Sequence, residues 1–134
     1  MDKQVIGWMD AAPMGLGPHG MWPQAIRVGN LIFLQGQTAF DMDGNLVGIG
    51  DPGAQARNAC ANIKALVEQL GGKLSDVVKI TVYITDVAFR PAGYTEITDA
   101  FGGRCPCSTG VVVRGLARPE LLVEIDAWAA VGEE

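Results

Sequence analysis

The order of the periodic segments constrains the fold of this chain more than any other feature of its sequence. Residues 78–84 alternate strictly, with apolar side chains at every second position, which predicts a strand with one buried face. Apolar residues that recur every three or four positions predict a helix before this strand. A shorter helix is predicted over residues 91–101, after the strand. This order predicts an α+β domain in which one mixed sheet carries two helices on one face. The recurring apolar residues of the first helix are Ala56, Cys60, Ile63, Val67 and Leu70.

The helix boundaries carry their own signals. Asp51 can accept hydrogen bonds from free backbone N–H groups at the start of the first helix, and Pro52 suits the first helical position. Gly71 and Gly72 end the first helix, and a second pair of glycines at 102–103 ends the other.

Short β-type runs account for most of the remaining sequence. Residues 25–28 and 31–35 flank Gly-Asn at 29–30 and predict a hairpin, and Asp-Gly at 43–44 predicts a second one. We expect the last two strands at residues 109–113 and 121–129. The whole chain, residues 1–134, reads as one domain with an N-terminal loop region over residues 1–22, because glycine and proline crowd residues 14–20.

Composition excludes several classes of protein. A chain of 134 residues with 49% apolar residues can bury one core. A net charge of −5 predicts no nucleic-acid partner and no anionic membrane surface, and no apolar run is long enough to span a bilayer. The first residues lack the features of a signal peptide, so we expect a cytoplasmic protein with its three cysteines reduced.

One face of the predicted sheet has no helix to cover it. Its Val, Ile and Phe side chains must be shielded from water, and a second copy of the chain is the simplest cover. We therefore expect self-association.

Two segments near the C-terminus carry a family resemblance: RCPCSTGVVV at 104–113 and GLARPELLVEIDA at 115–127. The chain resembles the RidA (YjgF) family of small imine and enamine deaminases from about residue 24 to residue 131. The resemblance implies a homotrimer whose sheets form an inner barrel, with a ligand cleft at each subunit boundary. It implies a small-molecule ligand and no cofactor.

Glu124 is the strongest candidate for catalysis. On its strand it shares one face with Asp126 and Trp128, while Val123 and Ile125 point to the other. Burial in an apolar strand would raise the pKa of this carboxyl toward a useful range. The resemblance implies that Glu124 holds the water that attacks an imine carbon. Without the resemblance, the simpler interpretation is that Glu124 is a solvated acid on an exposed strand face.

Ser108 departs from the family pattern, because it stands where the family has its catalytic arginine. Loss of an arginine–carboxylate contact costs about 1.5–3 kcal/mol. Arg114 lies six residues further along the strand and is too distant to replace it. Arg104, on a loop before Pro106, could turn into the cleft, although a solvated loop charge is the alternative.

The other predicted ligand-binding positions also come from the resemblance. Gly36 and Gln37 match the family motif Ser-Gly-Gln. Trp22 replaces a tyrosine, Tyr94 stands where many members have asparagine, and Gly110 where some have a cysteine. Together these changes make the cleft more aromatic and less suited to anions.

Three further residues near the predicted cleft remain open. His19 is the only histidine, and it is either a proton-transfer group or a solvated bystander. Cys105 and Cys107 make a poor zinc site without further ligands. They are reduced loop cysteines or a reactive pair, with Cys107 placed at the ligand.

These residues support two functions. The first is hydrolysis of an imine or enamine in a small metabolite, with Glu124 as the catalytic residue. The second is a trimer that binds a small ligand without catalysis, as Ser108 would permit. RNA cleavage is disfavoured by the acidic charge balance and the lack of a basic, aromatic stripe.

Overall fold

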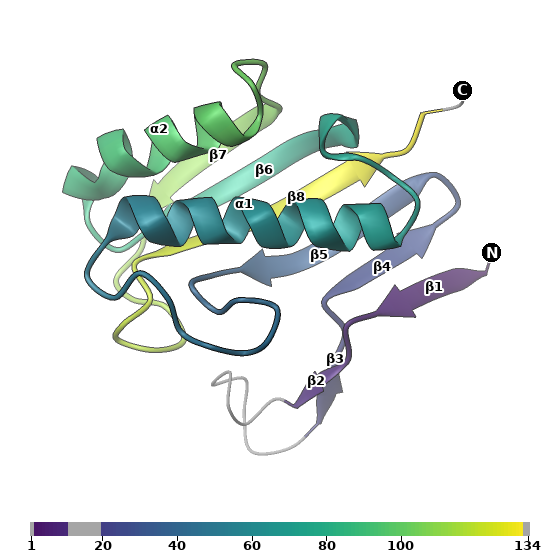
Figure 1. Ribbon diagram of the computed structural model, residues 1–134, viewed down its shortest axis with the longest axis horizontal. Helices are drawn as coiled ribbons and strands as arrows, with labels where there is room; N and C mark the ends of the chain where they lie inside the picture. Colours follow the sequence, from purple (N-terminus) through teal and green to yellow (C-terminus); the bar gives the residue numbers. More distant parts are fainter. Residues whose placement is uncertain (1, 11–19, 133–134) are drawn as a thin grey trace.

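The computed structural model describes residues 2–10 and 20–132 of the chain. A six-stranded sheet of order β1-β4-β5-β8-β6-β7 carries two helices on one face (Figure 1). A two-stranded sheet of β2 and β3 lies beside it. The elements are β1 Lys3–Ile6, β2 Met9–Asp10, β3 Met21–Trp22, β4 Ala25–Val28, β5 Leu31–Gln37, α1 Pro52–Gln69, η2 Leu74–Asp76, β6 Val77–Ile84, η3 Val87–Phe89, α2 Arg90–Ala100, β7 Cys107–Val112 and β8 Val123–Ala130.

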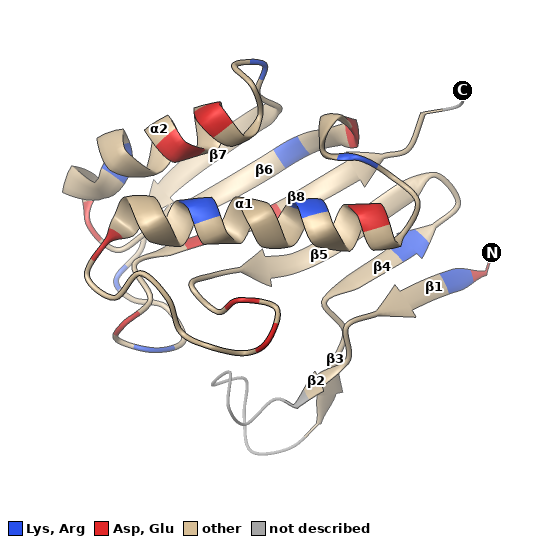
Figure 2. Ribbon diagram, in the orientation of Figure 1, with Lys and Arg blue, Asp and Glu red and all other residues tan. Residues whose placement is uncertain are grey.

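The sheet is mixed, as the sequence predicted. Strand β7 pairs parallel to β6, whereas the other neighbours in the large sheet pair antiparallel. The core lies between the sheet and the helices, where every second residue of β8 is buried, as it is in β6 from Ile80 to Ile84. A register shift between Val77 and Lys79 leaves Val78 exposed, so the predicted alternation fails at that one residue. Figure 2 shows charged residues mainly on the helices and loops and few on the strands. The α+β fold class is confirmed.

The first predicted hairpin is confirmed and the second is smaller than expected. Strands β4 and β5 join through a turn in which Gly29 has φ 60°. At the second position Gly44 has φ 86°, but the flanking segments share only an isolated bridge between Phe40 and Leu46. Asp41 explains this, because its carboxylate accepts the backbone N–H groups of Asp43 and Asn45 and closes a compact turn.

Helix α1 begins and ends where the sequence indicated. The Asp51 carboxylate accepts the backbone N–H of Ala54 at 3.0 Å, and Pro52 is the first helical residue. Gly71, with φ 86°, follows the end of the helix. None of the helices within residues 2–10 and 20–132 is long and apolar enough to cross a membrane.

The predicted ends of the last strands were wrong by about two residues. Strand β7 begins at Cys107, and β8 begins at Val123. The backbone N–H of Leu122 binds the Gln55 side chain, and that of Leu121 binds the Arg118 carbonyl. These bonds take both residues out of the ladder.

The interpretation of residues 1–22 as a loop region was wrong for its first part. Strand β1 pairs antiparallel with β4 along its whole length and forms an edge of the sheet. Lys3–Ile6 contains only two apolar residues, too short a pattern to identify from sequence. The predicted loop over residues 14–20 lies, apart from Gly20, outside the described residues.

Candidate functional site

Glu124 lies on the face of the sheet that the helices leave open. Val123, Ile125 and Ala127 are fully buried against the helices, and Glu124 and Asp126 alternate with them. The Glu124 side chain is partly buried. This desolvation, followed by repulsion from Asp126, raises the pKa of the Glu124 carboxyl above its usual value. The strand therefore holds a carboxyl group that keeps its proton to a higher pH than a fully solvated glutamate.

The carboxyl group of Glu124 lies directly against the backbone of Gly36. A Cβ at position 36 would stand 2.7 Å from Cδ and 2.9 Å from Cγ of Glu124. The register between β5 and β8 shifts between Leu34 and Gln37, so Gly36 sits in an irregular part of the ladder. Only glycine leaves room for the Glu124 side chain in this conformation, and any larger residue would require that side chain to move.

Asp126 has a different environment from Glu124. Its carboxylate accepts the Tyr83 hydroxyl at 3.1 Å and the Thr81 backbone N–H at 3.2 Å. Among the described residues, no side chain or backbone group donates a hydrogen bond to the Glu124 carboxylate. Asp126 is fixed by the sheet, while Glu124 keeps its acceptor positions for water or a ligand.

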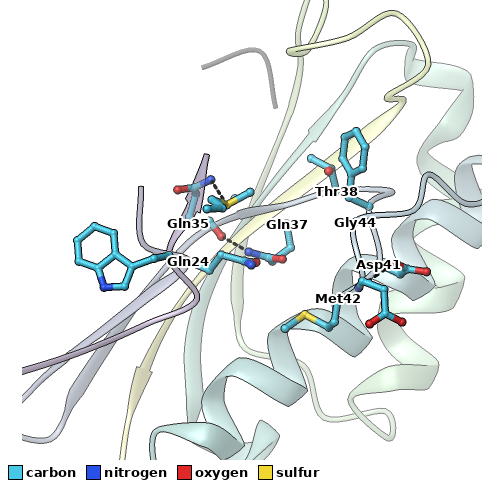
Figure 3. A pocket seen from close by; sticks show the side chains of 12 residues that line it. Gln24, Gln35, Gln37, Thr38, Asp41, Met42 and Gly44 are labelled. Atoms are coloured by element: carbon cyan, nitrogen blue, oxygen red, sulfur yellow. Dashed lines mark hydrogen bonds between the residues drawn. The ribbon is translucent and has the colours of Figure 1, made fainter. Parts of the chain in front are cut away.

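A pocket of about 310 Å³ opens beside Gly36. Gln37 lines it and donates from Nε2 to the Gln35 carbonyl at 3.0 Å, as Figure 3 shows. Gln24 and Gln35 add two more amides, and the turn around Asp41 forms the opposite wall. The pocket thus has neutral amide groups on one wall and the acidic residues Asp41 and Asp43 on the other. Its full lining is Trp8, Met9, Gln24, Gln35, Gly36, Gln37, Thr38, Phe40, Asp41, Met42, Asp43 and Gly44.

Trp22 lies next to this pocket rather than within it. It is 46% exposed and lines a shallower hollow, which shares Gln24 and Gln35 with the pocket beside Gly36. His19, the other residue predicted near this part of the cleft, lies outside the described residues.

Strand β7 presents its predicted site residues on two different faces. Ser108 and Gly110 pair with the buried residues Ile80 and Val82. The Ser108 side chain and the Cβ position of Gly110 therefore point to the helix side of the sheet. Cys107 pairs with Lys79 and faces the open side. Tyr94 from α2 reaches the backbone of Gly110, where a Cβ would collide with its hydroxyl.

Within one chain, the predicted residues therefore form two groups. Glu124 and Gly36 belong to the open face, whereas Ser108 and Tyr94 lie on the helix side. Strand β6 separates β8, which carries Glu124, from β7, which carries Ser108. Arg104 belongs to neither group. It lines a separate hollow with Leu74 and Phe101, near the start of β7.

Sequence reasoning missed three residues around these groups. Tyr83 and the structural role of Asp126 could have been found, because alternation places them on the same face of neighbouring strands. Arg90 gave no signal, since it stands at the boundary of a short helix. It lies 4.7 Å above the Tyr94 ring and reaches Gly110.

Known proteins match the chain along nearly its whole length. The family model described as "Endoribonuclease L-PSP" matches residues 12–131. A RutC family protein of Pyrococcus abyssi is 36% identical over 129 residues, covering 96% of this chain and 98% of the relative. A 2-iminobutanoate/2-iminopropanoate deaminase of Dermatophagoides farinae is 32% identical over 129 residues, covering 96% of this chain and 97% of the relative.

Solved structures agree with the sequence matches. The crystal structure of Rv2704 from Mycobacterium tuberculosis, described as a member of the YjgF/YER057c/UK114 family, superposes with a TM-score of 0.81 at 30% identity. That match covers 97% of this chain and 100% of the other. The RidA structure from Psychrobacter sp. gives a TM-score of 0.78 at 30% identity, covering 96% of this chain and 99% of the other.

Proposed function

The chain belongs to the RidA/YjgF/L-PSP family, and on this premise we propose that it hydrolyses the C=N bond of a small imine or enamine metabolite. The observation that carries the proposal is the Glu124 carboxyl: partly buried, raised in pKa, beside Gly36, and without a hydrogen-bond donor among the described residues. Such a group can hold a water molecule and exchange a proton with it.

The proposed reaction consumes one water. Glu124 accepts a proton as the water oxygen attacks the imine carbon, and the C=N double bond becomes a single bond. That proton passes from Glu124 to the nitrogen and gives a carbinolamine. The second proton of the water then passes from the new hydroxyl group through Glu124 to the nitrogen, the C–N bond breaks, ammonia leaves, and the carbon–oxygen double bond of the product forms. No electrons are gained or lost. Glu124 does not itself line the pocket beside Gly36, but it touches Gly36, which does. We propose that the amide groups of this pocket position the polar atoms of the substrate.

We further propose that the working form is a homotrimer. The open face of the sheet carries Trp128, 56% exposed, in edge contact with Phe33, and Val111 on β7, 37% exposed. Another copy would cover these side chains. Contact between copies could also bring the Ser108 group of one subunit to the Glu124 group of the next. Light scattering at micromolar concentration should give three times the chain mass, and a stable monomer would contradict the assembly.

The test of the reaction is Glu124→Gln. Imines of 2-aminobutanoate and alanine are generated in the assay by an amino-acid oxidase, and the release of ammonia and keto acid is followed. Loss of the proton-transfer group should lower turnover about 10²–10⁴-fold. Glu68→Gln, an exposed carboxyl on α1, is the matched control and should leave turnover unchanged.

A non-catalytic ligand-binding protein is the second candidate. The observation that favours it is Ser108, which provides one neutral hydroxyl at the position where the resemblance places an arginine. This alternative predicts no turnover of any imine by the unmodified protein, and no effect of Glu124→Gln beyond ligand affinity.

A further inference from the structure

Strand β7 is an edge of the six-stranded sheet, and within the part of the chain that the structure describes no strand pairs with its outer side. Val113 donates its backbone N–H to the Ile84 carbonyl of β6, and polar groups alternate along a strand. The backbone N–H groups of Ser108 and Gly110 therefore point away from β6, toward the open edge of the sheet. These two N–H groups can donate hydrogen bonds to an anionic ligand at this edge.

A guanidinium group lies next to these donors. Arg90, the first residue of α2, places Nη1 2.8 Å from where a Cβ of Gly110 would be, and Tyr94 places its hydroxyl at the same point. Gly110 has no left-handed φ. The glycine is therefore explained by the space that Arg90 and Tyr94 take in these conformations, not by the backbone conformation.

The charge of Arg90 is not neutralised by the part of the chain that the structure describes. The ion pairs found there are Arg57–Glu96, Lys64–Glu68 and Arg118–Glu120, and Arg90 takes part in none of them. Its described contact is with the face of the Tyr94 ring, at 4.7 Å. An exposed contact of this kind holds the guanidinium in place without removing its charge.

We propose that Arg90 supplies the cation for the carboxylate of the ligand, in place of an arginine on β7. Ser108 and Gly110 lie two residues apart on one side of the strand, about 7 Å at strand spacing. A carboxylate at this edge can bind the Arg90 guanidinium together with the backbone N–H of Gly110, the nearer of the two donors. The ligand class is a small 2-imino or 2-oxo acid. The identity of the acid rests on the function proposed above, but its binding does not.

Arg104 is the competing source of the cation. It lies in the hollow with Leu74 and Phe101, whereas Arg90 is already in contact with Gly110. The comparison of the two arginines is therefore the centre of the test.

The experiment measures binding of 2-oxobutanoate by calorimetry, which needs no turnover. Arg90→Ala should raise Kd about ten- to a hundredfold, since a hydrogen bond to a charged group contributes about 1.5–3 kcal/mol. Arg90→Lys keeps the positive charge but loses the planar guanidinium, which can donate two parallel hydrogen bonds to a carboxylate. Its affinity should therefore lie between those of Arg90→Ala and the unmodified protein. Lys64→Ala, which removes one positive charge from α1, should leave Kd unchanged.

Gly110→Ala provides a second route to the same result. The added methyl group displaces Arg90 and Tyr94 without removing either, and should weaken binding as Arg90→Ala does. Circular dichroism and light scattering confirm that each variant keeps its fold and assembly.

Each outcome separates this inference from the proposed reaction. If imines are hydrolysed but Kd and KM are the same in Arg90→Ala, or if Arg104→Ala causes the loss instead, the role of Arg90 is overturned and the reaction stands. If no imine is hydrolysed while 2-oxobutanoate binding depends on Arg90, the reaction fails and the inference stands. Absence of 2-oxobutanoate binding by the unmodified protein overturns the inference.

Discussion

The backbone of Gly36 and the carboxyl group of Glu124 are in direct contact across the β5–β8 ladder. Gly36 does not have a left-handed φ, so the contact itself explains the glycine. In Gly36→Ala the new methyl group would lie 2.7 Å from Cδ of Glu124. Glu124 must then move, and we expect turnover of 2-iminobutanoate to fall at least tenfold, because a small misplacement of a catalytic group is costly.

The matched control for this prediction is Gly115→Ala. A Cβ at Gly115 meets nothing within 4 Å, and its φ also lies outside the left-handed region. This variant should keep full activity. Equal activity of the two alanine variants and the unmodified protein would show that the position of Glu124 is not critical.

Glu124 should also leave a signature in the pH dependence of stability. Burial and Asp126 raise its pKa in the folded chain above the ordinary value of 4.5, so the folded state binds the proton more tightly than the unfolded state. Its contribution to stability is full below about pH 4.5 and is lost as pH rises through the folded-state pKa.

Glu124→Gln removes this titration. Melting temperatures are measured from pH 4 to pH 8 at one protein concentration. The melting temperature of the variant should rise relative to that of the unmodified protein as pH rises, and should be the higher of the two at neutral pH. Two parallel curves would mean that the Glu124 pKa is the same in the folded and unfolded states. Glu68→Gln serves as the exposed control.

The fold could be predicted because its signals are local. Alternation in β6 from Ile80 to Ile84 and the Asp51–Pro52 start of α1 depend on neighbouring residues alone, and both are present as expected. The start of β8 could not be predicted, because a side chain 67 residues away, Gln55, takes the Leu122 N–H out of the ladder. Strand β1 was missed because its pairing with β4 is a tertiary contact.

The candidate site could be predicted only one element at a time. Sequence alternation placed Glu124 on the correct face of its strand, as its burial pattern shows. The contact with Gly36 depends on an irregularity in β5, and the approach of Arg90 to Gly110 depends on how α2 crosses β7. Neither contact could be predicted from the spacing of apolar residues, because each joins elements that are distant in the sequence.

Gln55 is predicted to hold α1 to the segment that leads into β8. The fully buried side chain donates Nε2 to the carbonyls of Gly48 and Glu120, at 3.1 and 2.9 Å, and accepts the Leu122 N–H at 2.8 Å. Gln55→Ala leaves these groups unpaired and should cost about 2–4 kcal/mol in the free energy of unfolding. Urea denaturation measures this loss.

The control for Gln55 lies on the same helix. Gln69→Ala changes an exposed glutamine in the last turn and should alter stability by less than about 0.5 kcal/mol. If Gln55→Ala is no more destabilising than Gln69→Ala, the three hydrogen bonds of Gln55 do not contribute to stability.

The cysteines should differ sharply in reactivity. Cys60 is 2% exposed, and its pKa is raised to about 12, mainly by burial and further by Cys105 and Glu96. Cys105 is exposed. Since the thiolate is the reactive form, Cys60 should be inert in the folded protein. In a Cys107→Ser background we expect one thiol per chain to react with a disulfide reagent at pH 8, and two after denaturation. Adding Cys105→Ser should abolish the reaction of the folded protein, whereas a remaining fast thiol would show that the α1 side of the core opens to solvent.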